Sequence, residues 1–123
     1  MTKSLSIIGN IKRLDGSTEI MSDSLSVSEN YTEVSVQEIT IAAAGTDVAL
    51  NLNGVTTAQL VILVPTYASS STEYFTMKID GGSESIKFGK MAVLGGKGAN
   101  GITALTVTNP DASNPFQLKV YLA

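Results

Sequence analysis

From residue 31 to its end, the chain alternates apolar and polar residues in short stretches, and this pattern constrains the fold most. The last stretch, residues 116–122, reads Phe-Gln-Leu-Lys-Val-Tyr-Leu, so every second side chain is apolar. Residues 74–80 behave in the same way, with Phe75, Met77 and Ile79 on one side. Alternation with a period of two places the apolar side chains on one face of an extended strand. No segment of helical length has a clean 3.6-residue period, so the pattern predicts an all-β chain.

Turn residues separate these stretches about every 8–12 residues, which gives about eight strands after residue 30. Such spacing is typical of an antiparallel sandwich of two sheets with jelly-roll or Greek-key connections. The length of 123 residues and the mass of 12.8 kDa fit one domain. A compact monomer of that mass exposes about 6,300 Å² of surface. We therefore predict a β-sandwich (jelly-roll) domain over residues 31–123.

Several local features predict details of this sandwich. Residues 60–64 (Leu-Val-Ile-Leu-Val) are apolar without alternation, which predicts a central strand covered on both faces, one of them by a neighbouring subunit. Pro65 is expected to end that strand, because proline cannot donate to the ladder. A change in the parity of the apolar residues predicts a β-bulge at residues 37–38. Residues 53–54 (Asn-Gly) and 80–82 (Asp-Gly-Gly) predict tight turns.

The first 30 residues follow a weaker pattern. Glycines and many serines oppose a helix, although some of the apolar residues fit one helical face. We predict an extended N-terminal arm over residues 1–30 that carries one or two strands. The arm packs on its own sandwich or on another chain; the alternative is an N-terminal strand that completes the domain's own sheet.

Composition excludes several function classes. The chain has no cysteine, histidine or tryptophan, so it lacks thiol nucleophiles, His-based triads and the usual zinc and iron ligands. Eight basic and eleven acidic side chains, with a pI near 4.7, provide no basic patch for nucleic acid. The longest apolar run has five residues, too few to cross a bilayer. We expect a soluble protein made in a reducing cytoplasm, with neither nucleic acid nor membrane as a partner.

Two motifs have a possible chemical reading. Residues 96–101 match G-x-G-x-x-G, but a strand pattern follows, whereas a dinucleotide site needs a helix there. Residues 30–32 (Asn-Tyr-Thr) form a glycosylation sequon, which matters only in a secretory route. No serine lies in G-x-S-x-G beside a base that could activate it. We interpret residues 96–101 as a loop between strands.

Acidic and aromatic side chains offer further candidates. Glu73, Asp80 and Glu84 could share one end of a hairpin, and Asp80, Glu84 or Asp111 could bind calcium, although no D-x-D-x-D-G spacing is present. Solvated turn residues are the commoner outcome. Four tyrosines could form a sugar-stacking surface if they were exposed together: Tyr31, Tyr67, Tyr74 and Tyr121. We predict no catalytic residue, cofactor, metal or small-molecule substrate.

The hydrophobic and turn pattern resembles small jelly-roll virion proteins of tailed bacteriophages. The similarity lies in residues 39–50, 60–64, 77–81, 104–110 and 116–121. It extends over about three-quarters of the chain, from residue 31 to 123, and leaves the arm unmatched. It implies a structural protein of the virion: a capsid decoration (cement) protein, or a piece of tail, baseplate or fibre. The resemblance implies no active-site residues.

The same resemblance implies a homo-oligomer, in the form of a trimer, that binds the major capsid protein or another virion protein. A cyclic oligomer would also cover the apolar strand and the sheet edges. The candidate interface residues are Leu5, Ile7, Ile8, Ile11, Leu14, Leu60, Ile62 and Val64. A receptor- or sugar-binding module of a fibre is the alternative function, and an enzyme is disfavoured by the composition.

Overall fold

The computed structural model describes residues 3–31, 35–52, 55–68, 72–95 and 100–123. Within them the chain is all-β, as predicted, and contains no α-helix. No described helix is therefore long and apolar enough to cross a membrane. The strands are β1 (Lys3–Asp15), β2 (Thr18–Tyr31), β3 (Ser35–Ile41), β4 (Val48–Ala49), β5 (Leu60–Tyr67), β6 (Phe75–Ile79), β7 (Ile86–Phe88), β8 (Ala92–Gly95), β9 (Leu105–Thr108) and β10 (Phe116–Leu122).

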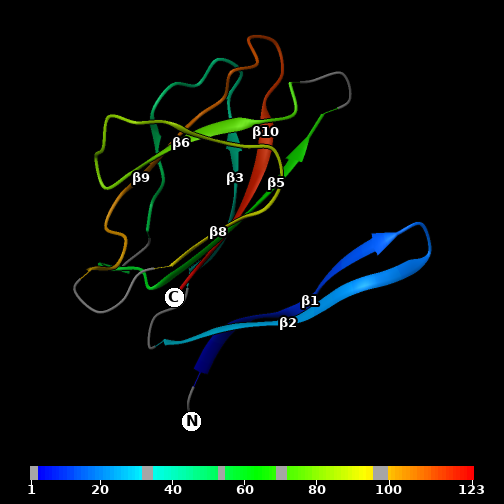
Figure 1. Ribbon diagram of the computed structural model, residues 1–123. Coiled ribbons are helices and arrows are strands. Elements are labelled where there is room, and N and C mark those ends of the chain that lie inside the picture. Colours follow the sequence, from blue (N-terminus) through cyan, green and yellow to red (C-terminus); the bar gives the residue numbers. More distant parts are fainter. Residues whose placement is uncertain (1–2, 32–34, 53–54, 69–71, 96–99) are drawn as a thin grey trace.

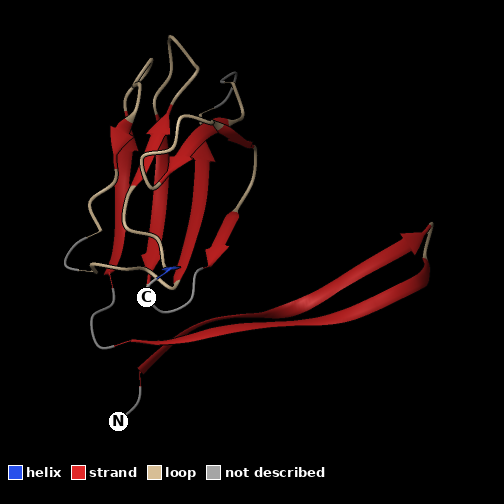
Figure 2. Ribbon diagram, turned by 60° about the vertical axis from the view of Figure 1, so that its left-hand side comes forward, coloured by secondary structure: helices blue, strands red, loops and turns tan. Residues whose placement is uncertain are grey.

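The strands form three sheets in which all pairings are antiparallel (Figure 1). Two four-stranded sheets, with the orders β3-β10-β5-β8 and β4-β9-β6-β7, pack against each other. This arrangement confirms the antiparallel sandwich. The third sheet is the hairpin β1-β2, which extends well beyond the sandwich (Figure 2). Two sheets of four strands form the sandwich, and the hairpin, residues 3–31, adds a third sheet of two strands to the predicted two sheets.

The last strand organises the core. β10 lies between β3 and β5, and its burial alternates along its whole length. Phe116, Leu118, Val120 and Leu122 are all buried in the core between the sheets, as the alternation predicts. Phe75 and Met77 of β6 reach the same core from the opposite sheet. Complete burial of such side chains contributes about 1.5–3 kcal/mol each.

A row of aromatic rings joins the two sheets. The ring centroids of Tyr67 and Phe116 are 5.5 Å apart, those of Phe116 and Phe75 are 5.6 Å apart, and those of Phe75 and Phe88 are 5.7 Å apart. Tyr67 and Phe116 belong to one sheet, and Phe75 and Phe88 to the other. Aromatic pairs at this separation are favourable beyond the area that they bury. The row therefore connects the two layers through the core.

The hydroxyl of Tyr67 is the polar exception in this row. It is buried and has no hydrogen-bond partner among the described residues. Burial, together with the negative charge of Glu73, raises the pKa of Tyr67 to about 12. An unpaired buried hydroxyl costs stability, because its hydrogen bonds to water are lost without replacement.

We expect Tyr67→Phe to leave the thermal midpoint unchanged or to raise it by a few degrees, because only the unpaired hydroxyl is removed. Tyr67→Ala is the matched variant; it also removes the ring contact with Phe116 and should lower the midpoint clearly. Thermal unfolding followed by circular dichroism measures both. A lower midpoint for Tyr67→Phe would mean that the hydroxyl has a stabilising partner.

The apolar run in β5 forms a central strand, as predicted. Val61 and Leu63 face the core between the sheets, whereas Leu60, Ile62 and Val64 face outward in a second apolar cluster. The strand does not end at Pro65, because it pairs with β10 as far as Tyr67. β8 pairs with β5 from Leu60 only as far as Leu63. Beyond Leu63 that edge of β5 has no partner among the described strands, so Pro65 does not have to donate a hydrogen bond there.

The predicted β-bulge at residues 37–38 is absent. β3 pairs with β10 without a register shift, and the two residues lie opposite Val120 and Lys119. Without a bulge, the apolar residues on the two sides of residues 37–38 point to opposite faces of the strand. Ile41 is therefore buried, whereas Val36 is 57% exposed. Residues 53–54 lie outside the described part of the chain. The turn at Asp80 and Gly81 is confirmed, with φ angles of 52° and 72°.

Candidate interaction surface

The sheet β3-β10-β5-β8 carries apolar side chains on the face that points away from the core. Val36, Tyr121, Ile62 and Val93 are successive cross-strand partners, so their side chains form one row across all four strands. Ile62 is buried at the centre of the row, whereas Val36 and Val93 at its ends are 57% and 41% exposed. We call this surface the outer apolar face.

The base of the N-terminal hairpin covers the middle of the outer apolar face. Leu5 and Ile7 of β1 are half-buried and pack against a cluster that contains Leu60, Ile62 and Ala123, with Val64 and Tyr121 at its margin. Five of the eight predicted interface residues therefore meet in one place: Leu5, Ile7, Leu60, Ile62 and Val64. Their contact lies within one chain, so the hairpin of the same molecule, and not the predicted neighbouring subunit, covers the middle of this face.

The hairpin has two different faces. Ile7 lies opposite Val27, Gly9 opposite Leu25 and Ile11 opposite Asp23, so these pairs continue the face that carries Leu5. This apolar face of the hairpin begins on the sandwich and runs outward. The opposite face, the serine face, carries Ser4, Ser6, Ile8, Asn10, Lys12, Ser22, Ser24, Ser26, Ser28 and Asn30.

Beyond its base the hairpin leaves apolar side chains uncovered. Ile11 is 59% exposed and Val27 36%, both on the apolar face. Ile8 is 79% exposed but lies on the serine face, and Leu14, 57% exposed, follows a register shift. The structure thus separates these three predicted interface residues (Ile8, Ile11 and Leu14) from the other five.

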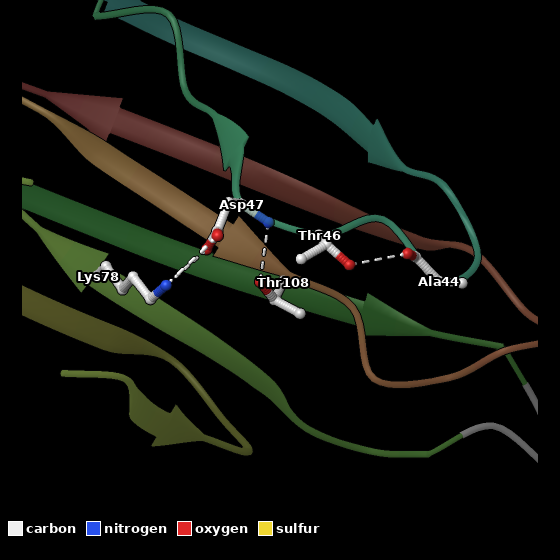
Figure 3. Close-up of polar contacts among 5 residues, drawn as sticks. All are labelled: Ala44, Thr46, Asp47, Lys78 and Thr108. Atoms are coloured by element: carbon white, nitrogen blue, oxygen red, sulfur yellow. Dashed lines mark hydrogen bonds and ion pairs between the residues drawn. The ribbon is translucent and has the colours of Figure 1, made fainter. Parts of the chain in front are cut away.

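The outer face of the other sheet is polar. Thr76, Lys78, Thr106 and Thr108 lie on it as cross-strand neighbours. At its edge, the backbone N–H of Asp47 donates to Thr108 Oγ1 at 2.9 Å, and Lys78 Nζ lies 3.2 Å from the Asp47 carboxylate (Figure 3). Thr46 Oγ1 donates to the carbonyl of Ala44 in the preceding turn. The two outer faces of the sandwich therefore differ in chemistry.

Two of the four carboxylates that the sequence singled out, Asp111 and Asp80, have structural roles. Asp111 is buried and accepts hydrogen bonds from the backbone N–H groups of Thr72, Ser113 and Asn114 at 2.7, 2.8 and 2.9 Å. These bonds, that of Thr72 first, lower the pKa of Asp111 to about 2. Among the described residues, no three acidic side chains gather as a metal site would require.

Asp80 plays a similar part at the turn between β6 and β7. Its carboxylate accepts bonds from the backbone N–H and hydroxyl of Thr103 and from the backbone N–H of Ala104, at 2.7, 3.0 and 3.1 Å. The backbone bond from Thr103 contributes most to a lowered pKa of Asp80. Asp80 and Asp111 thus each stabilise a different loop, with different partners.

The tyrosines have different surroundings. Tyr67 packs on Phe116, the ring of Tyr74 has Lys87 Nζ 4.0 Å from its centroid, and Tyr121 borders the outer apolar face. The side chain of Tyr31 lies outside the described part of the structure, as do parts of the glycine-rich stretch at residues 96–101 and of the sequon at residues 30–32. The described tyrosine rings therefore do not form one stacking surface.

Sequence reasoning predicted an arm with one or two strands but not their pairing as a hairpin, although two signals for the hairpin are present. Asp15-Gly16 is a strong turn dipeptide, and Gly16 has a φ of 63°. Serines at every second position from Ser22 to Ser28 give the alternation of a strand with one polar face.

Comparison of the chain with models of known families, with curated proteins and with solved structures finds no match.

Proposed function

We propose that the protein is a non-enzymatic structural component of a bacteriophage virion, a capsid decoration protein that binds the shell as a trimer. We also propose that its sandwich is a jelly roll. The observation that carries the jelly roll, and through it favours the structural role, is the nested pairing of the sandwich strands: β3 with β10, β4 with β9, β5 with β8, and β6 with β7.

Nested pairs of this kind are what results when one long antiparallel ribbon is rolled up. The two remaining pairings, β10 with β5 and β6 with β9, join neighbouring turns of that ribbon within each sheet. Jelly rolls are common in viral capsid domains and in lectins, so the fold alone does not determine function. The likeness of the sequence pattern to small phage virion proteins favours the capsid role.

The different outer faces support a role in adhesion. The face with Thr76, Lys78, Thr106 and Thr108 is polar and suits contact with water. The outer apolar face and the hairpin carry the exposed apolar side chains Val36, Val93 and Ile11, which suit contact with protein. A trimer that presents three such surfaces would hold neighbouring capsomers through several weak contacts at once.

The proposal predicts that virions contain many copies of this protein and that the shell is weaker without it. We expect particles of the encoding phage that lack the protein to release DNA at a lower temperature, and purified protein to restore the wild-type release temperature. DNA release measured with an intercalating dye, after mass spectrometry of purified particles, tests both expectations.

Gold labelling in electron micrographs locates the protein on the particle. Label spread over the shell supports the decoration role, whereas label confined to the tail or fibres would replace it with the tail or receptor-binding alternative. Absence of the protein from purified virions contradicts a virion role altogether.

A further inference from the structure

The total surface that one chain exposes is large for a protein of this size. The chain exposes 7590 Å², about 1,300 Å² more than the 6,300 Å² or so expected of a compact monomer of its mass. Stable interfaces bury about 1,200–2,000 Å² in total. The excess comes with the long hairpin that projects from the sandwich in both views (Figures 1 and 2).

A two-stranded sheet without a third layer is only marginally stable in water. The base of the hairpin has such a layer, because Leu5 and Ile7 pack on the outer apolar face. The distal part, residues 8–27, continues the same apolar face with Ile11 and Val27, which are 59% and 36% exposed. We therefore expect the distal part to be covered by another surface.

The surface that already binds the hairpin base is only partly used. On either side of buried Ile62, the row across the sheet ends in the exposed side chains of Val36 and Val93. Every copy of the chain thus carries a free distal hairpin and a partly filled face that accepts a hairpin. Other copies of the same chain can supply both missing partners: a face for the distal hairpin and a hairpin for the exposed part of the face.

The dimensions allow this exchange. From Ile8 to Asp15 the distal hairpin extends over eight residues, about 26 Å at 3.3 Å per residue. The four strands of the accepting sheet are about 14 Å apart from first to last, at about 4.8 Å between neighbours. The distal hairpin is therefore long enough to reach from one exposed end of the row on another molecule to the other, alongside the hairpin base that covers its middle.

We infer that the hairpin of one copy lies with Ile11 and Val27 on the outer apolar face of the next copy, alongside that copy's own hairpin base, and contacts the exposed side chains of Val36 and Val93. The contact joins two different surfaces, so it is head-to-tail and closes into a ring when each copy both gives and receives a hairpin. This inference rests on the proposed function only for the number of copies, three, and otherwise stands on the structure.

Two lysine substitutions on the full-length chain test the contact from both sides. Ile11→Lys places a charge on the apolar face, opposite Asp23, so pairing within the hairpin is kept. Val93→Lys places one on the accepting face. The matched controls are Asn10→Lys on the serine face and Ala49→Lys, exposed on the other sheet. Light scattering after size exclusion gives the oligomeric state, and circular dichroism shows that each variant is folded.

We expect wild type and both controls to be trimers, and Ile11→Lys and Val93→Lys each to need at least a tenfold higher concentration to associate. Mixed together, these two variants should form a two-chain complex, because one intact hairpin still meets one intact face. If Val93→Lys fails to fold, Val36→Lys replaces it at the other end of the row.

A monomeric wild type, an unaffected Ile11→Lys, an equal effect of Asn10→Lys, or a mixture that does not associate would each overturn the inference. Binding to phage particles is measured separately. If the mutants behave as expected but no virion contains the protein, the proposed function fails while the hairpin exchange stands. If virions contain the protein but the mutants associate like wild type, the hairpin exchange fails while the proposed function stands.

Discussion

Phe75→Ala should lower the free energy of unfolding of the sandwich by about 3–5 kcal/mol. The Phe75 ring is fully buried and lies between those of Phe88 and Phe116, at 5.7 and 5.6 Å, so its removal interrupts the contact between the two sheets. In a domain of this size, such a loss corresponds to a fall of about 15–30 °C in the thermal midpoint. Denaturant unfolding followed by circular dichroism suits a chain without tryptophan.

The control for this substitution is Ile86→Ala on the neighbouring strand. Ile86 is 46% exposed, so its truncation should change stability by less than about 1 kcal/mol. If Phe75→Ala also costs less than about 1 kcal/mol, the aromatic row does not hold the sheets together.

The second large effect is expected at Asp111. Asp111→Ala removes the acceptor of three backbone N–H groups, two of them within its own loop and one on Thr72 across the molecule. Donors that lose a buried acceptor destabilise the fold, and we expect the thermal midpoint at neutral pH to fall by about 5–15 °C. Asp15→Ala, at an exposed position beside the hairpin turn, is the control and should have little effect.

The same substitution should change how stability depends on pH. The pKa of Asp111 is about 2 in the folded protein against an ordinary value of 3.8, so the unfolded chain takes up this proton first. The stabilisation is complete above about pH 4 and is lost as the pH falls toward 2. Thermal midpoints measured between pH 6 and 2 should therefore converge for wild type and Asp111→Ala. A constant difference down to pH 2 would contradict this role of the carboxylate.

The strands with regular alternation could be predicted from the sequence. In β10 and β6 the inward residues, Phe116 and Phe75 among them, are those that the alternation placed inside. The turn at Asp80 was also predictable, since Asp-Gly tolerates the positive φ that it adopts. These features depend only on residues near one another in the chain.

Features that depend on distant residues could not be predicted. The continuation of β5 past Pro65 follows from where β8 stops pairing, at Leu63. The exposure of Val36 follows from an unbroken register with β10. The use of Leu5 and Ile7 to cover β5 requires that the hairpin fold back onto the sheet, and periodicity within either segment contains no such information.

The nested order of the strands also affects how the protein is made. Among the described strands, β3 pairs in its sheet with β10 alone, and β5 has β10 on one side, so both strands complete their pairing only after β10 has been made. During synthesis the innermost pair, β6 with β7, can form early, whereas the apolar β5 emerges with one edge unpaired. Long-range pairing of this kind slows folding and exposes intermediates to aggregation. Nascent chains that stop before residue 116 should therefore remain incompletely folded. They need protection from aggregation until β10 has left the ribosome.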